Sequence, residues 1–338
     1  MNTQNTTFQT VLDSLLDTKK EFPRRYLNQF SDMRTLELQT LQEVWPRVGL
    51  SRKLSLLEEL ESLADEDTLV SFDDFARPLL HDPDAGVRIH ALRLLNESED
   101  VRLIQPIVEL LKHDPDVNVR AEAAGTLAHF VALGELDEIP WEAYSQVQTG
   151  LLESAHSEDD TRIKRQALES LGFSSDEEVL KLIESTLNKR DSEWQVSALI
   201  AIGRSADDRW EEEVLLGLTD ADTRVRLAAV QAAGNLALKS ARPILLRVLE
   251  EEEDEDDVIT SAIWSLSQIG GEDVRTYLEN LLDQTEDDDQ AEFLEEALDN
   301  LTFTEDLDRF ALMSFNPDEI EGFEDDDEES EDEAEDEK

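Results

Sequence analysis

Apolar residues recur along most of this chain with helical spacing, in seven copies of one nine-residue pattern. Numbered from zero at its first residue, the pattern is apolar at positions 0, +4, +5 and +8 in nearly every copy, which places these side chains on one face of a helix. Position +4 is alanine in all seven copies. The copies begin at Val87, Val119, Ile163, Trp194, Val225, Val258 and Phe293. The pattern predicts seven amphipathic helices, each able to approach a neighbouring helix closely at its alanine.

The repeats have a nearly constant length. Successive position +4 alanines lie 31 to 35 residues apart, except for a step of 44 residues between Ala123 and Ala167. A further apolar helix is expected before each patterned helix, over residues 72–80, 101–112, 141–155, 177–187, 210–218, 241–249 and 274–282. Two helices in a unit of this length are typical of a helical solenoid. We therefore predict an all-α fold, a right-handed α-α superhelix, and assign the long step to a loop insertion at 133–141.

Four segments are expected along the chain. A solenoid of about seven helical hairpins spans residues 67–303, and residues 1–66 form an N-terminal helical cap with a degenerate repeat, because a terminal unit must shield the apolar face of its neighbour. Residues 304–323 form a capping segment at the other end. Residues 324–338 hold twelve acids and one lysine but no large apolar residue, so we expect a disordered acidic C-terminal tail.

The loops between paired helices carry a regular charge pattern. An acid stands three residues before position 0 in six of the seven copies, where its side chain can accept hydrogen bonds from the free N–H groups of the following helix. Position +1 is basic in four copies. We predict that these charges form a structural ladder of ion pairs along one edge of the array, rather than a basic stripe that binds a ligand. The ladder residues are Asp84, Arg88, Asp116, Arg120, Asp160, Lys164, Asp222 and Arg226.

Position +9 is small in most copies. The residues are Ala128, Gly172, Gly203, Gly234 and Ser267. A small residue at this position indicates that the helix ends there or that another backbone passes close by.

The paired helices, the Asp-Pro-Asp loops at 82–84 and 114–116, and second helices that begin V-R-x-x-A resemble HEAT repeats, of the type grouped with phycobilisome-lyase HEAT-like proteins. The resemblance covers about residues 70–303. It implies a HEAT/ARM-type solenoid whose second helices line a concave face.

The charge of the chain restricts its partners. The formal net charge is −53, and the last fifteen residues account for only −11 of it. Such a field repels nucleic-acid phosphate and anionic lipid, so neither nucleic acid nor a membrane is an expected partner, whereas basic proteins are attracted. No stretch approaches the roughly 18 continuous apolar residues that a membrane span needs. The N-terminus also lacks a basic segment followed by an apolar run, so we expect a cytoplasmic protein.

Residues with candidate catalytic chemistry are scarce. The chain has no cysteine, which excludes disulfides and thiolate metal sites. Deoxyhypusine hydroxylases share the HEAT-type fold but hold two irons with His-Glu pairs, and no histidine here is followed by Glu. The histidines are His81, His90, His113, His129 and His156. The acidic runs at 250–257 and 286–289 lack the glycine turn and alternating ligands of a calcium loop. We predict no catalytic, metal or cofactor site.

An apolar strip is a candidate for partner binding. Positions +2 and +6 of the second helices can be exposed on the concave face, and they are polar or small in most units. In the middle units they become apolar, at Val196, Ile200, Leu227 and Trp264. We predict that these four side chains anchor a partner. The alternative, that they pack between successive helices, stays open at this point.

The sequence therefore favours a non-catalytic scaffold or adaptor that binds a protein partner with basic segments through its concave face. Two other functions stay open. One is a HEAT-like lyase or hydroxylase-type enzyme or enzyme accessory, and the other is a chaperone-like shield for basic clients. Neither the partner's identity nor the oligomeric state follows from the sequence.

Overall fold

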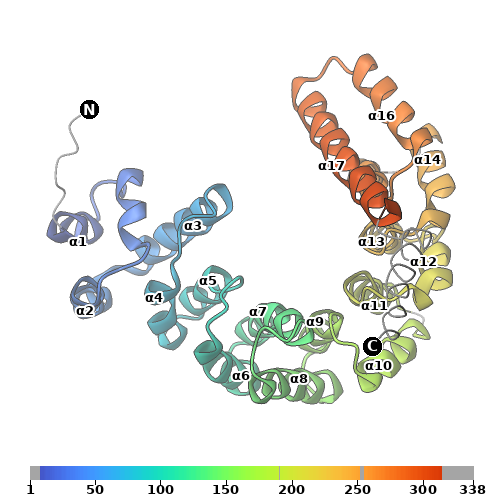
Figure 1. Ribbon diagram of the computed structural model, residues 1–338. Helices are drawn as coiled ribbons and strands as arrows, with labels where there is room; N and C mark the ends of the chain where they lie inside the picture. Colours follow the sequence, from blue (N-terminus) through green and yellow to red (C-terminus); the bar gives the residue numbers. More distant parts are fainter. Residues whose placement is uncertain (1–7, 190, 252–254, 314–338) are drawn as a thin grey trace, which may run out of the picture.

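Helices stacked side by side build an open arc. The structure is a computed structural model and describes residues 8–189, 191–251 and 255–313. Within these ranges every regular element is an α-helix or a short 3-10 helix. Figure 1 shows the helices in two layers, one on the outer and one on the inner side of the arc. The predicted all-α superhelix is confirmed for the described residues, and the predicted acidic tail at 324–338 lies outside them.

The two layers alternate along the chain, as the repeat pattern predicts. The outer helices are α4 (Asp73–Ala76) with η3 (Arg77–His81), η4 (Val101–Leu103) with α6 (Ile104–His113), α8 (Trp141–His156), α10 (Glu177–Leu187), η5 (Asp208–Trp210) with α12 (Glu211–Gly217), η6 (Lys239–Ala241) with α14 (Arg242–Glu251), and α16 (Glu272–Gln284). The inner helices are α5 (Ala85–Leu94), α7 (Val117–Glu135), α9 (Thr161–Leu171), α11 (Ser192–Arg204), α13 (Thr223–Asn235), α15 (Asp256–Ile269) and α17 (Asp288–Met313). Each inner helix carries one copy of the nine-residue pattern.

The N-terminal segment adds helices to the start of the array. They are α1 (Phe8–Leu16), η1 (Arg24–Phe30), α2 (Thr35–Val44), η2 (Trp45–Arg47) and α3 (Leu50–Glu66). The ring of Phe30 packs edge-on against Phe75 of α4, with 5.1 Å between ring centroids. Trp45 packs against the same ring at 5.6 Å. Aromatic packing thus joins this segment to the first outer helix.

A continuous apolar core lies between the two layers. All seven position +4 alanines are fully buried, which lets the helices on either side approach closely. One core cluster runs from Val11 in α1 to Leu301 in α17. Because each unit buries its apolar face against the next one, the array is stabilised by contacts between neighbouring units.

The long step of 44 residues has a different cause from the one expected. The sequence suggested a loop insertion at 133–141, but α7 continues as a helix to Glu135 and α8 begins at Trp141. The extra residues therefore lengthen a hairpin. Tyr144 of α8 holds the two helices of this hairpin together near the loop that joins them. Its ring lies against Gly134 of α7, and its hydroxyl donates to Glu135.

The position +9 residues lie where neighbouring inner helices pass each other. A Cβ at Gly172 would lie 2.6 Å from the Cα of Ala201, and one at Gly234 would lie 2.8 Å from the Cα of Ser265. Real side chains do not tolerate such distances to backbone atoms. Glycine at these positions therefore sets the spacing of successive inner helices.

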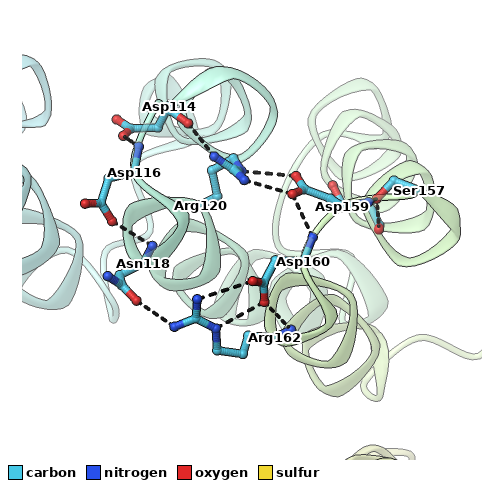
Figure 2. Close-up of polar contacts among 9 residues, drawn as sticks. Asp114, Asp116, Asn118, Arg120, Ser157, Asp159, Asp160 and Arg162 are labelled. Carbon is cyan, nitrogen blue, oxygen red and sulfur yellow. Dashed lines mark hydrogen bonds and ion pairs between the residues drawn. The ribbon is translucent and has the colours of Figure 1, made fainter.

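Ion pairs link successive loops at one edge of the array; Arg88–Asp114 is buried, and Arg120–Asp159 is partly exposed. Arg88 donates two hydrogen bonds of 2.8 Å to the carboxylate of Asp114 in the next loop and a third, of 2.9 Å, to the carbonyl of Asp82 in its own loop. Arg120 repeats this geometry with the carboxylate of Asp159 and the carbonyl of Asp114 (Figure 2). Each arginine thus holds its own loop and the next one together.

The same type of link begins one unit earlier. Lys53 of α3 donates to Asp82 over 2.7 Å, and both side chains are almost fully buried. The indole N–H of Trp45 donates to the same carboxylate over 2.8 Å. Helix α3 is therefore joined to the array by the same kind of charged contact.

The aspartates assigned to the ladder have a different role from the arginines. Each accepts a hydrogen bond from a backbone N–H at the start of the following helix, which makes it the N-cap. The pairs are Asp84 with Val87, Asp116 with Asn118, Asp160 with Arg162, and Asp222 with Arg224. Arg88 and Arg120 pair with other acids of the neighbouring loop, because the N-cap side chains point along their own helix axes. Arg226 holds its own loop through the carbonyl of Asp220.

The ladder is interrupted at the third copy of the pattern. Lys164 occupies the position of Arg88 and Arg120, but the described residues offer it no ion pair. Lys189 stands where Asp114 stands in its own loop, and its amino group lies 3.2 Å from the centre of the Trp194 ring. Burial, together with repulsion from Lys164, lowers the pKa of Lys189.

The last helix crosses an expected boundary. α17 runs from Asp288 to Met313, so residue 303, the expected end of the solenoid, lies inside a helix. The expected capping segment at 304–323 begins as a continuation of that helix, and its residues from 314 onward lie outside the described ranges.

Asp114→Ala should lower the free energy of unfolding by about 3–5 kcal/mol, because it leaves the buried guanidinium of Arg88 without its partner. Urea denaturation followed by circular dichroism measures this. Lys181→Ala removes an exposed pair with Glu177 and should leave the free energy of unfolding nearly unchanged. Equal losses for the two variants would contradict a stabilising role for the ladder.

Gly172→Ala should destabilise the protein by about 1–3 kcal/mol, since its Cβ would collide with the backbone of α11. Gly125→Ala should instead stabilise the protein. A Cβ there meets only Gln166, at an ordinary 3.5 Å, and inside a helix alanine is more favourable than glycine by about 0.5–1 kcal/mol. Thermal denaturation of both variants gives the sign directly.

Candidate functional site

A groove of about 1620 Å³ follows the inner side of the arc in the N-terminal half of the molecule. Its lining residues come from α3, α5, α7 and α9, from the loops after α3, α5 and α9, and from the start of α4, and it ends at Arg204 of α11. In Figure 1 these helices lie next to one another along the concave edge. The groove is open, as a surface that receives a segment of another molecule must be.

Small residues on α7 form the floor of the groove. Ala121, Gly125, Ala128 and Ala132 are spaced four, three and four residues apart, which places them on one face of the helix. Neighbouring helices carry longer side chains at the groove, such as Arg93 of α5 and Gln166 of α9. The hollow therefore results from missing side-chain volume on one inner helix.

Acidic residues gather at the end of the groove formed by α3 and α5. Asp65, Glu97 and Glu99 are exposed, and among the described residues their carboxylates have no hydrogen bond or ion pair. Asp73 also lines this end and accepts a hydrogen bond from Ser98. This end of the groove is consequently strongly negative.

A further acid in this region is Asp100, whose charge is compensated. Hydrogen bonds from Arg102 hold its pKa at about 2, and Arg77 also pairs with it. It therefore stays ionised at neutral pH without contributing a free negative charge.

The wall between α3 and α7 is a charged network. Glu61 of α3 lies 2.6 Å from the ring nitrogen of His90, and Arg93 of α5 bridges Glu61 and Glu122 of α7. Burial raises the pKa of Glu61. Because Arg93 is shared between two acids, its charge is already neutralised.

The opposite end of the groove has a different charge. No acid lines the groove on α9 or α11, and the residues there are Arg162, Gln166, Phe173 and Arg204. Arg162 is paired with Asp160 and also donates to Asn118. Arg204 lies over the ring of Phe173 at 5.4 Å and donates to the carbonyl of Glu169 over 2.8 Å.

A smaller pocket of about 320 Å³ lies at the N-terminal end of the array, between α2 and η3. Leu38, Leu41, Phe75 and Leu79 form its apolar walls. The buried Lys53–Asp82 pair lies at one side of this pocket. The carboxylate of Asp82 already accepts hydrogen bonds from Lys53, from Trp45 and from the backbone N–H of Asp84.

The predicted apolar strip lies outside the groove, on α11, α13 and α15. Val196, Ile200 and Leu227 are half-buried and pack against the core. Trp264 differs from them, because it is 39% exposed and its nearest ring partner is Phe293 of α17 at 6.4 Å. Of the four residues predicted to bind a partner, only Trp264 is exposed to solvent, and the other three are half-buried.

The histidines do not gather into a metal centre. The described residues contain no group of three or more His, Asp or Glu side chains that could hold a metal ion. His90 and His113 lie beside single carboxylates, those of Glu61 and Glu109. No helix in the ranges that the structure covers is long and apolar enough to cross a bilayer.

Comparison with known proteins assigns the repeats to a family. The family model for HEAT repeats matches residues 74–141 and 211–299, which include four of the seven patterned helices. The chain contains HEAT repeats. The resemblance expected from the Asp-Pro-Asp loops is therefore confirmed. No curated protein matches the HEAT-repeat chain.

Several solved structures are similar to the HEAT-repeat array. YibA of E. coli is 16% identical, with 82% of this chain and 96% of that chain covered and a TM-score of 0.42. Kap121p bound to Ste12p is 15% identical, with coverages of 88% and 37% and a TM-score of 0.44. Human deoxyhypusine hydroxylase in complex with glycerol is 15% identical, with coverages of 78% and 95% and a TM-score of 0.31.

Sequence reasoning missed the groove, although a signal for part of it was present. Position +10 of the pattern, one residue beyond the small position, is Glu97, His129, Phe173 and Arg204 in four successive units. All four side chains line the groove. Equivalent positions of neighbouring repeats lie side by side, so this row could have been read along the array.

Trp264→Ala should lower the free energy of unfolding by only about 0.5–1.5 kcal/mol, the contribution of one exposed aromatic contact. Trp210 offers a matched comparison, since it is 6% exposed and its replacement by alanine should cost about 3–5 kcal/mol. Melting temperatures of both variants test this. A loss for Trp264→Ala as large as that for Trp210→Ala would make Trp264 a core residue.

Proposed function

We propose that this protein is a non-catalytic adaptor that binds a basic segment of a partner protein in its concave groove. The observation that carries the proposal is the set of three unpaired carboxylates, Asp65, Glu97 and Glu99, at one end of a groove large enough for a peptide. A basic side chain placed there would supply the counter-charge that the protein's own residues do not.

The cations that line the groove do not offset these acids. Arg93 is divided between Glu61 and Glu122, and Arg162 is paired with Asp160. The acidic end therefore keeps its full charge. Lysine or arginine side chains of a partner would be attracted from a distance by the net charge of −53 and then held at this end of the groove.

The exposed indole of Trp264 supports a second contact on the same concave side. It lies beyond the groove, on α15, and tryptophan is among the residues that most often dominate binding energy at protein interfaces. In this proposal the groove holds the charged segment, and Trp264 receives an apolar side chain further along the partner.

Neutralising the three acids should weaken binding of a basic peptide. The test uses a fluorescein-labelled ten-residue peptide with Lys or Arg at its first three positions and Ala, Ser and Gly elsewhere. The triple variant Asp65→Asn, Glu97→Gln and Glu99→Gln should bind it about tenfold more weakly at low salt, three partly solvated ion pairs being worth about 1–2 kcal/mol. Fluorescence polarisation at graded salt should also show a shallower dependence on ionic strength.

A matched control separates the groove from the general negative field. Glu211, Glu212 and Glu279 are exposed acids on the outer helices α12 and α16, and their replacement by glutamine changes the net charge equally. This control triple should bind the peptide nearly as tightly as the unmodified protein. If both triples weaken binding to the same extent, the peptide is held by net charge, and the proposal for the groove fails.

A further inference from the structure

The groove changes the sign of its charge along its length. The position +10 row begins with the acid Glu97 after α5, passes His129 and Phe173, and ends with Arg204 at the end of α11. The unpaired acids are confined to the first end. The α9 and α11 end carries cations and no lining acid.

Arg204 forms no salt bridge within the part of the chain that the structure describes. Its protein contacts there are the Phe173 ring and the carbonyl of Glu169. The carboxylate of Glu169 attracts the guanidinium electrostatically, but its hydrogen bond comes from Ser197. The side chain is half-buried, and burial lowers the pKa of Arg204 below the usual value for an arginine.

An arginine in this state is prepared for an anion. One of its N–H groups is used by the carbonyl of Glu169, and the guanidinium lies over the Phe173 ring at 5.4 Å. Its remaining N–H groups can bind a carboxylate, and a partly desolvated site strengthens such a bond. Next to Phe173 in the row stands His129, whose buried Nε2 has no hydrogen-bond partner among the described residues.

We propose that the groove binds its partner segment in one direction, with basic residues at the α3–α5 end and a carboxylate on Arg204. This rests on the proposed function and adds the polarity and length of the bound segment. Three helix spacings of about 8–10 Å separate α5 from α11, roughly 24–30 Å in all. An extended chain rises about 3.3 Å per residue, so about eight residues separate the basic side chains from the carboxylate.

The carboxylate can come from a chain terminus or from an Asp or Glu side chain. Four labelled ten-residue peptides separate these sources. The first has three basic residues at its N-terminal end and a free C-terminus. The second is its C-terminal amide, and the third is the amide with Glu at the last position. The fourth has a free C-terminus and the basic residues at the C-terminal end.

The full-length protein should bind the first peptide about tenfold more tightly than the second, because a charged hydrogen-bonded pair with Arg204 is lost on amidation. This preference runs against the net charge of −53, which by itself would favour the amide. Binding of the third peptide at the level of the first identifies a side-chain carboxylate as sufficient, and binding at the level of the second identifies the chain terminus. The fourth peptide should bind at least tenfold more weakly than the first.

Arg204→Gln should reduce the ratio of the affinities for the first and second peptides to less than twofold. Arg204→Lys should restore part of this ratio. The readout is a ratio within one variant, so a general loosening of the fold affects both peptides alike. Arg209→Gln removes an exposed arginine that pairs with Asp207 and should leave the ratio unchanged.

Two outcomes would overturn the inference: equal binding of the first two peptides by the unmodified protein, or an unchanged ratio in Arg204→Gln. If both peptides bind equally and binding still depends on Asp65, Glu97 and Glu99, the adaptor function stands and only the directional binding fails. If no basic peptide binds, the proposed function fails as well.

Discussion

The close approach of successive inner helices is the constraint on which the rest of the structure depends. Helices that pass at Gly172 and Gly234 leave no room for a Cβ, and the alanines at position +4 are fully buried behind them. Small residues on the inner layer, with larger side chains packed between the layers, favour a curved stack over a flat one. The concave face exists because of this packing.

The ion pairs between loops hold the loops in register. Arg88 and Arg120 each use one side chain to hold two loops, which a purely apolar contact could not do with the same geometric specificity. Such pairs add less net stability than their number suggests, because burying them costs solvation energy. Their interruption at Lys164 and Lys189 falls at the N-terminal ends of α9 and α11. At the opposite ends of the same two helices, the half-buried Arg204 of α11 donates to the carbonyl of Glu169.

The repeats place charged side chains at regular positions along the array. Equivalent positions of neighbouring units lie next to each other, so a row of side chains can present a sequence of charges along the concave face. The row from Glu97 to Arg204 does this over four units. The net charge of −53 favours the approach of basic partners, and the order of charges along the groove would set the direction in which a bound segment lies.

The nine-residue pattern determined the all-α class, the two-layer units and the buried alanines, because apolar periodicity and the need to bury it act locally and repeat. The N-cap role of Asp84 and Asp116 was also readable, since a cap lies within its own helix. Tertiary structure alone decided that Arg88 pairs with Asp114, that Val196 and Ile200 are half-buried against the core, and that small residues of α7 open a groove. Each of these depends on which neighbouring helix faces the side chain and at what distance, and a linear pattern does not contain that distance.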